Sequence, residues 1–81
     1  MVSQFQTVLE KIIIPQFPDI HHVEVVELPS RGFYRVTYVL NRSLDKRNDY
    51  IKLMEETTAL YKMLTPDLRG DIIVEFENLD D

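Results

Sequence analysis

Hydrophobic residues recur at helical spacing in two segments of the chain. In residues 3–14 they follow the i, i+3, i+4, i+7 pattern of one stripe on an α-helix. Pro15 disfavours helical backbone at the residue before it, so this helix is expected to end there. Residues 46–64 form a second, longer helical segment, which Pro66 is expected to end. Its stripe consists of Tyr50, Leu53, Met54, Thr57, Leu60, Tyr61 and Leu64.

Three other segments, residues 20–28, 33–41 and 72–76, are rich in β-branched residues and are predicted to be strands. Residues 33–41 alternate most regularly. One face of this strand carries Tyr34, Val36, Tyr38 and Leu40 and is predicted to face the core, while the other carries Phe33, Arg35, Thr37 and Val39. In residues 20–28, the adjacent Val25 and Val26 interrupt the alternation, which indicates either two covered faces or a β-bulge.

The predicted order of elements is therefore α-β-β-α-β. It favours a single α+β domain over residues 1–81, with residues 78–81 as a frayed acidic tail. We expect a two-layer sandwich in which two helices pack on one face of a three-stranded sheet, ferredoxin-like or KH-like in outline. The strand order stays open. The third strand lies beside the second in a mixed sheet, or beside the first in an antiparallel one.

The composition of the chain excludes several classes of function. The chain has no cysteine, which excludes disulfides, thiolate catalysis and cysteine-based metal sites. It shows no secretory signal and no membrane span, so we expect a soluble, cytoplasmic protein. The formal net charge is −5, yet residues 31–52 hold six Lys and Arg against two acids. The chain is thus expected to be dipolar rather than uniformly acidic.

Candidate catalytic and metal-binding groups are few. His21 and His22 are adjacent, and adjacent strand residues point to opposite faces, so only His22 and Glu24 are expected to share one. Two ligands make a weak site, and no third is evident. The serines have capping or turn roles, and Gly32 and Gly70 form no phosphate-binding loop. We expect no enzyme activity, no metal and no cofactor.

Residues 31–38 resemble the RRM RNA-binding signature, K/R-G-F/Y-G/A-F-V-x-F/Y, at five of its seven specified positions. The matching residues are Arg31, Gly32, Phe33, Val36 and Tyr38. The signature's second stacking aromatic falls at Arg35 and its small residue at Tyr34. The element order is also similar to that of small αββαβ modules that dimerise in regulatory domains. These resemblances imply RNA binding or self-association, without assigning the chain to either family.

The strand face opposite the helices is the candidate functional surface. Aromatic residues and Arg are enriched at the cores of protein interfaces, so we predict binding of a protein partner or a second copy. The predicted partner-binding residues are Phe33, Arg35, Val39 and Ile73. The alternative is single-stranded RNA or DNA binding through residues 31–42. It would use Arg31, Phe33, Arg35, Arg42 and Arg47. Glu24, Glu75 and Glu77 are expected near the same face, which favours protein over nucleic acid.

Overall fold

A computed structural model describes residues 2–29, 32–42, 47–65 and 70–79 of the chain. Its helices and strands follow the predicted order. They are α1 (Val2–Ile12), the 3-10 turn η1 (Ile14–Gln16), β1 (Ile20–Glu27), β2 (Tyr34–Leu40), α2 (Arg47–Leu64) and β3 (Ile72–Asn78).

Two predicted ends differ from the observed ones by two residues, and the other boundaries differ by at most one. α1 ends at Ile12, and η1 then contains Pro15, which lacks the N–H needed to continue an α-helix. β3 extends two residues beyond the predicted 72–76, because Asn78 pairs with Leu40 of β2. Asn78 is therefore part of the sheet rather than of a tail, and residues 80 and 81 lie outside the described residues.

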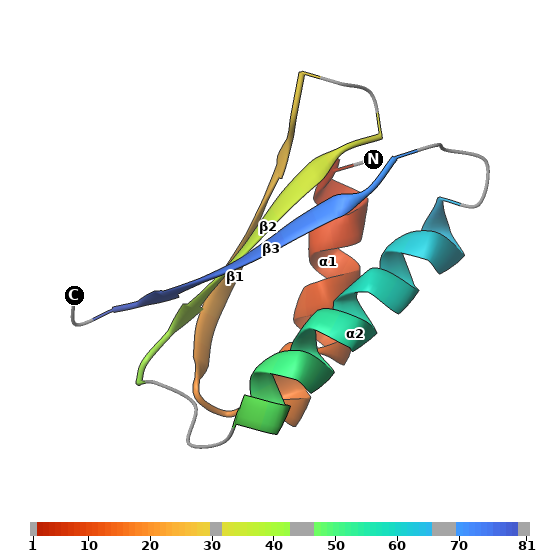
Figure 1. The fold of residues 1–81 in the computed structure, drawn as a ribbon. Coiled ribbons are helices and arrows are strands. Elements are labelled where there is room, and N and C mark those ends of the chain that lie inside the picture. The colour runs from red at the N-terminus through yellow and green to blue at the C-terminus, as the bar shows by residue number, and fades with distance from the viewer. Residues whose placement is uncertain (1, 30–31, 43–46, 66–69, 80–81) are drawn as a thin grey trace.

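The three strands form one mixed sheet in the order β1-β2-β3. β1 and β2 are antiparallel neighbours, whereas β2 and β3 run parallel. Of the two strand orders that the sequence leaves open, the structure therefore has the mixed one. Figure 1 shows α1 and α2 on the same side of this sheet, and among the described residues no helix lies on its opposite side. The fold is of the α+β class.

β2 is the central strand, and its helix-facing side forms the middle of the core. Tyr34, Val36, Tyr38 and Leu40 are each at most 1% exposed, which confirms the predicted core face. Thr37 and Val39, on the other side of β2, are only 8% and 7% exposed. A strand that is buried on both sides belongs in the middle of a sheet, where neighbours on each side shield it.

Aromatic rings join the two helices to β2 at one end of the core. Phe5 of α1, Tyr34 of β2 and Tyr61 of α2 contact one another, with ring centroids 5.7–6.1 Å apart. The Tyr61 hydroxyl donates a hydrogen bond to the carbonyl of Gly32, just before β2. Gly32 has a φ of 85°, a left-handed conformation that glycine adopts readily. Gly32 therefore allows the backbone turn that the hydrogen bond from Tyr61 stabilises.

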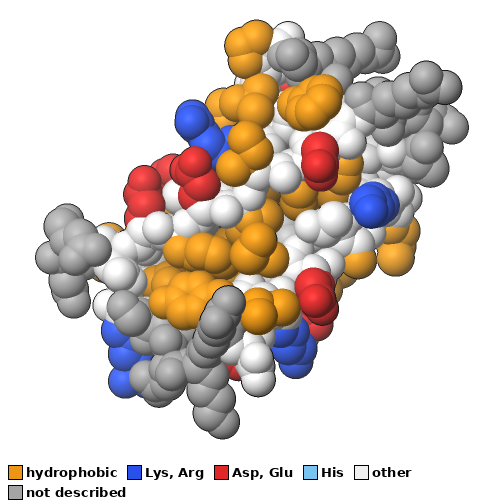
Figure 2. Space-filling model, viewed as in Figure 1, with side chains coloured by type: hydrophobic (Ala, Val, Ile, Leu, Met, Phe, Trp, Pro, Cys, Tyr) orange, Lys and Arg blue, Asp and Glu red, His pale blue; other side chains and the backbone are white. Residues whose placement is uncertain are grey.

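The hydrophobic layer covers the two edges of the sheet unequally. On β1, Val23 and Val25 are 1% and 7% exposed, whereas Ile72, Val74 and Phe76 on β3 are only half-buried. Figure 2 shows hydrophobic side chains gathered at the surface over β3 and the adjacent α2. The core is thus closed over β1 and remains partly open beside β3.

Candidate functional site

The side of the sheet without helices, called the outer face below, presents three rows of side chains. The strand register sets these rows, because directly paired residues lie on the same side of the sheet. The rows are Val26–Arg35–Ile73, Glu24–Thr37–Glu75 and His22–Val39–Glu77. One end of the outer face is therefore cationic and hydrophobic, and the other carries carboxylates and imidazole.

Three of the four predicted partner-binding residues are accessible. Arg35 is exposed, Phe33 is 38% exposed and Ile73 is 51% exposed. Val39 lies in the third row but is only 7% exposed, so little of it can be contacted. The register brings Arg35 and Ile73 side by side, with Phe33 two residues before Arg35. The accessible part of the predicted site is thus concentrated at one end of the outer face.

Val26 belongs to this end of the outer face, although it was not among the predicted partner-binding residues. It pairs with Arg35 from the β1 side and is 46% exposed. The adjacent valines of the sequence already indicated this position of Val26. Val25 is buried in the core, so the adjacent Val26 must point to the opposite side of the strand. Arg35 therefore stands between two exposed β-branched side chains.

Arg35 has no carboxylate partner among the residues that the structure describes. The ion pairs in this part of the chain join His22 to Glu24 and Arg42 to Asp19. Glu24 and Glu75 lie in the next row, flanking Thr37 rather than Arg35. The guanidinium of Arg35 is thus available to an external carboxylate or phosphate.

The two histidines lie together, which corrects the expectation that they point to opposite faces. A β-bulge between Ile20 and His22 inserts His21 as an extra residue and brings the Nδ1 atoms of the two rings within 2.7 Å. His22 Nε2 lies 3.3 Å from Glu24 Oε1. Because a carboxylate only accepts, His22 donates through Nε2, and its Nδ1 accepts from His21 when both rings are neutral.

This cluster offers two imidazoles and one carboxylate that is already hydrogen-bonded to one of them. Among the described residues, no three His, Asp or Glu side chains converge as ligands of one metal ion. The hydrogen-bonded chain from His21 through His22 to Glu24 instead fixes the orientation of both rings. These hydrogen bonds therefore set how the histidine rings lie at the acidic end of the outer face.

The two described arginine side chains proposed for nucleic-acid binding, Arg35 and Arg42, lie towards opposite ends of β2. Arg42 Nε donates to Asp19 Oδ1 at 2.8 Å, so its charge is partly balanced within the chain. Arg31 and the side chain of Arg47 lie outside the described residues. Within the described part of the predicted nucleic-acid site, Phe33 and Arg35 alone share the hydrophobic end of the outer face.

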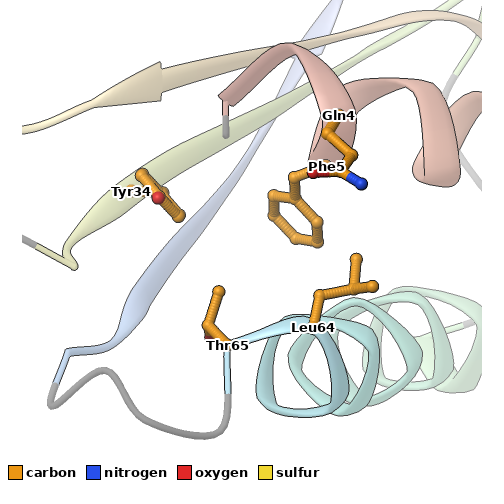
Figure 3. Close-up of a pocket in the computed structure, with 5 residues that line it drawn as sticks. All are labelled: Gln4, Phe5, Tyr34, Leu64 and Thr65. Atoms are coloured by element: carbon orange, nitrogen blue, oxygen red, sulfur yellow. The ribbon is translucent and has the colours of Figure 1, made fainter.

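A small hollow lies on the other side of the sheet, between the ends of α1 and α2. Figure 3 shows Gln4, Phe5, Tyr34, Leu64 and Thr65 around it. Its volume is about 60 Å³, room for about two water molecules at about 30 Å³ each. Small-molecule sites are typically about 300 Å³ or larger. The hollow therefore represents imperfect packing rather than a substrate pocket, and neither histidine lines it.

No protein-family model, curated protein or solved structure matches this chain. Within the described residues, neither helix is long and hydrophobic enough to cross a membrane. The candidate site accordingly rests on the geometry and charge of the outer face itself.

Proposed function

We propose that the chain is a small, non-catalytic interaction module that self-associates through the outer face of its sheet. The observation that carries this proposal is Arg35, exposed and without an ion pair in the described part of the chain, between exposed Val26 and Ile73. A central Arg bordered by hydrophobic side chains is typical of the core of a protein interface.

The two ends of the outer face carry complementary charges, with Arg35 at one end and Glu77 at the other. Two copies can stack face to face, about 10 Å apart, around a two-fold axis that crosses the strands at Thr37. Because this rotation reverses the strand direction, Arg35 of each copy then lies over the row His22–Val39–Glu77 of the other. The cationic end of one face thereby meets the acidic end of the other, twice.

The small size of the outer face makes this dimer weak. Three strands of seven or eight residues cover about 14 Å by about 23 Å, or about 330 Å² on each copy. Stable interfaces typically bury about 800 Å² on each partner. We therefore expect association at about 100 µM protein rather than at nanomolar concentration.

Light scattering after gel filtration, at about 100 µM protein, tests this proposal. We expect a mass between monomer and dimer that rises with concentration. Arg35→Glu is expected to abolish the rise, and adding Glu77→Arg is expected to restore it, because the double variant exchanges the two charges. Lys62→Glu, on the exposed surface of α2, is the matched control for net charge. A strict monomer at this concentration would contradict the proposed homodimer.

We extend the proposal to the fold outline and the cellular location of the module. The order of its helices and strands favours a ferredoxin-like or KH-like outline, and we place the module in the cytoplasm. A protein partner with a similar arrangement of charge could replace the second copy, within a larger assembly.

Single-stranded RNA or DNA is the second candidate ligand, because Phe33 and Arg35 are both exposed at the same end of β2. Bases could stack on Phe33 while phosphates contact Arg35. Glu24 and Glu75, in the row beside that of Arg35, disfavour this binding. Amide-shift titration with short oligonucleotides at low salt tests it. Shifts confined to residues 31–42 would support nucleic-acid binding, and their absence would reject it.

A further inference from the structure

Among the described residues, β3 is an edge strand of the sheet with no strand on its outer edge. Tyr34 N–H donates to Asp71 O at 3.1 Å, and Leu79 N–H donates to Leu40 O at 2.8 Å, so odd-numbered residues beside and within β3 face β2. In a parallel ladder the bonded residues alternate. The main-chain groups of Ile72, Val74, Phe76 and Asn78 therefore point away from β2. Within the described residues, no strand pairs with them.

One of these outward groups is already satisfied. Ile72 N–H donates to Asp71 Oδ1 at 2.8 Å. The free part of the edge thus starts at the Ile72 carbonyl and includes the N–H and C=O groups of Val74 and Phe76. This spacing matches the hydrogen-bonding positions of an added strand.

The side chains of the same residues form an unfinished hydrophobic layer. Ile72, Val74 and Phe76 are half-buried, and the Phe76 ring meets Tyr50 of α2 edge-on, with centroids 4.9 Å apart. On α2, Ile51 and Met54 are 42% and 43% exposed. Figure 2 shows the hydrophobic surface over β3 and α2. A strand added beside β3 would place alternate side chains against this surface and bury it.

The opposite side of β3 is acidic. Glu75 and Glu77 are exposed on the outer face, and Asp71 is exposed just before the strand. A second copy of β3 would bring two more glutamates to the same side, and like charges across strands are destabilising. The other edge strand, β1, contains Glu24 and Glu27 but no Lys or Arg. Neither edge of a second copy therefore complements β3.

We propose that the free edge of β3 binds an extended segment of another protein in which hydrophobic residues alternate with Lys or Arg. The hydrophobic residues cover Val74, Phe76 and Met54, and the basic residues lie beside Glu75 and Glu77. Main-chain hydrogen bonds to β3 hold the segment, as in other cases of strand addition. The main-chain edge of β3 takes no part in the proposed self-association, although Glu77 has a role in both proposals.

The first test uses the fluorescently labelled peptide Lys-Val-Lys-Val-Lys-Val-Lys, which matches β3 in length. Anisotropy at about 150 mM salt measures its affinity, and amide shifts map its site. We expect the largest shifts in residues 72–78 and at Met54. We also expect binding at least tenfold weaker for a peptide with Glu in place of Lys and for one with the same residues in scrambled order. Equal binding of all three peptides, or shifts away from β3, would overturn the proposal.

Backbone N-methylation of the peptide separates strand addition from simple charge attraction. Methyl groups on the alternate residues whose N–H groups face β3 should abolish binding, whereas methyl groups on the other set should leave it nearly unchanged. The two methylated peptides carry the same charge and the same side chains. Indistinguishable affinities for the two would show that no strand is added.

Variants of the protein complete the test. The double variant Glu75→Lys, Glu77→Lys is expected to bind the Lys peptide at least tenfold more weakly. It should bind the Glu peptide more tightly than the original protein does. Glu10→Lys with Glu55→Lys, both exposed on the helices, is the matched control and should change each affinity by less than threefold. Arg35→Glu, designed to prevent self-association, should leave peptide binding intact. Peptide binding that tracks only the net charge of the protein would contradict a site on β3.

Discussion

Tyr38 is a titratable residue buried in the core. Its ring is 0% exposed, and its hydroxyl lies 2.6 Å from Thr57 Oγ1. Thr57 Oγ1 itself donates to Leu53 O at 2.6 Å, so Tyr38 is the donor in their shared bond. Burial, with the nearby Glu56 charge as a smaller cause, raises the pKa of Tyr38 to about 12. The phenol therefore folds in its neutral form.

This shift predicts a loss of stability in alkali. The folded pKa of Tyr38 lies above the unfolded value of about 10, so its contribution is complete below pH 10 and is lost as pH rises towards 12. At about 1.4 kcal/mol per pKa unit, the loss is about 3 kcal/mol at most. Urea unfolding between pH 8 and pH 12 measures it. Tyr38→Phe should be less stable at pH 8 but show a shallower decline, and equal slopes would contradict the assignment.

At the residue scale, periodicity predicted which side chains of β2 are buried, because alternation follows directly from strand geometry. It failed at His21 and His22. A bulge adds one residue to β1, and no glycine or turn residue marks its position in the sequence. Once the bulge is placed, Val23 and Val25 fall on the core side and Val26 on the outer face. The composition of the outer face thus depends on one backbone irregularity.

At the element scale, a close backbone contact fixes the start of β2 against the start of β3. A Cβ atom built on Gly70 would overlap the carbonyl of Gly32 and would lie 2.7 Å from the Tyr61 hydroxyl. The same carbonyl accepts the hydrogen bond from Tyr61. Gly70 therefore allows α2, β2 and the approach to β3 to meet at one point.

We accordingly expect Gly70→Ala to destabilise the fold by about 1–3 kcal/mol, the usual range for overpacking, because backbone must move to make room. Thermal or urea unfolding measures the loss. Asn41→Ala, at an exposed site outside the helices and strands, is the control and should stay within about 0.5 kcal/mol of the original protein. A Gly70→Ala variant as stable as this control would contradict the contact.

The kinds of elements were predictable from the sequence, but their arrangement was only partly so. Both strand orders satisfied the alternation of residues 72–76, since alternation does not reveal a strand's neighbour. A usable signal existed in β2, where Thr37 and Val39 add β-branched residues to the outer side of an already hydrophobic strand. Such two-sided patterns favour a central position. The partial exposure of β3, in contrast, results from where the helices lie and could not be seen in its sequence.

At the scale of the whole molecule, charge and size determine how two copies meet. Each copy has a formal net charge of −5 and a Cα radius of gyration of 12.3 Å. In a dimer joined by outer faces about 10 Å apart, the centres of the two copies are about 20 Å apart. Their unscreened repulsion in water is then about 5 kcal/mol. Exposed pairs such as Arg35–Glu77 typically contribute at most about 1 kcal/mol each.

Salt should therefore tighten self-association. Raising the ionic strength from about 0.01 M to about 0.15 M shortens the Debye length from about 30 Å to about 8 Å. Most of the repulsion between copies is thereby removed, whereas only a small attraction between the faces is lost. We expect the dimer dissociation constant, from sedimentation equilibrium at the two salt concentrations, to fall about tenfold.

The same salt series distinguishes the two candidate functions. Binding of an oligonucleotide releases counterions, so its affinity falls as salt rises. Self-association that weakens with salt would mean that local ion pairs, rather than net charge, control the contact between the outer faces. In Lys62→Glu the net charge becomes −7 while the outer face is unchanged. This variant should therefore associate more weakly than the original chain at low salt and nearly equally at high salt.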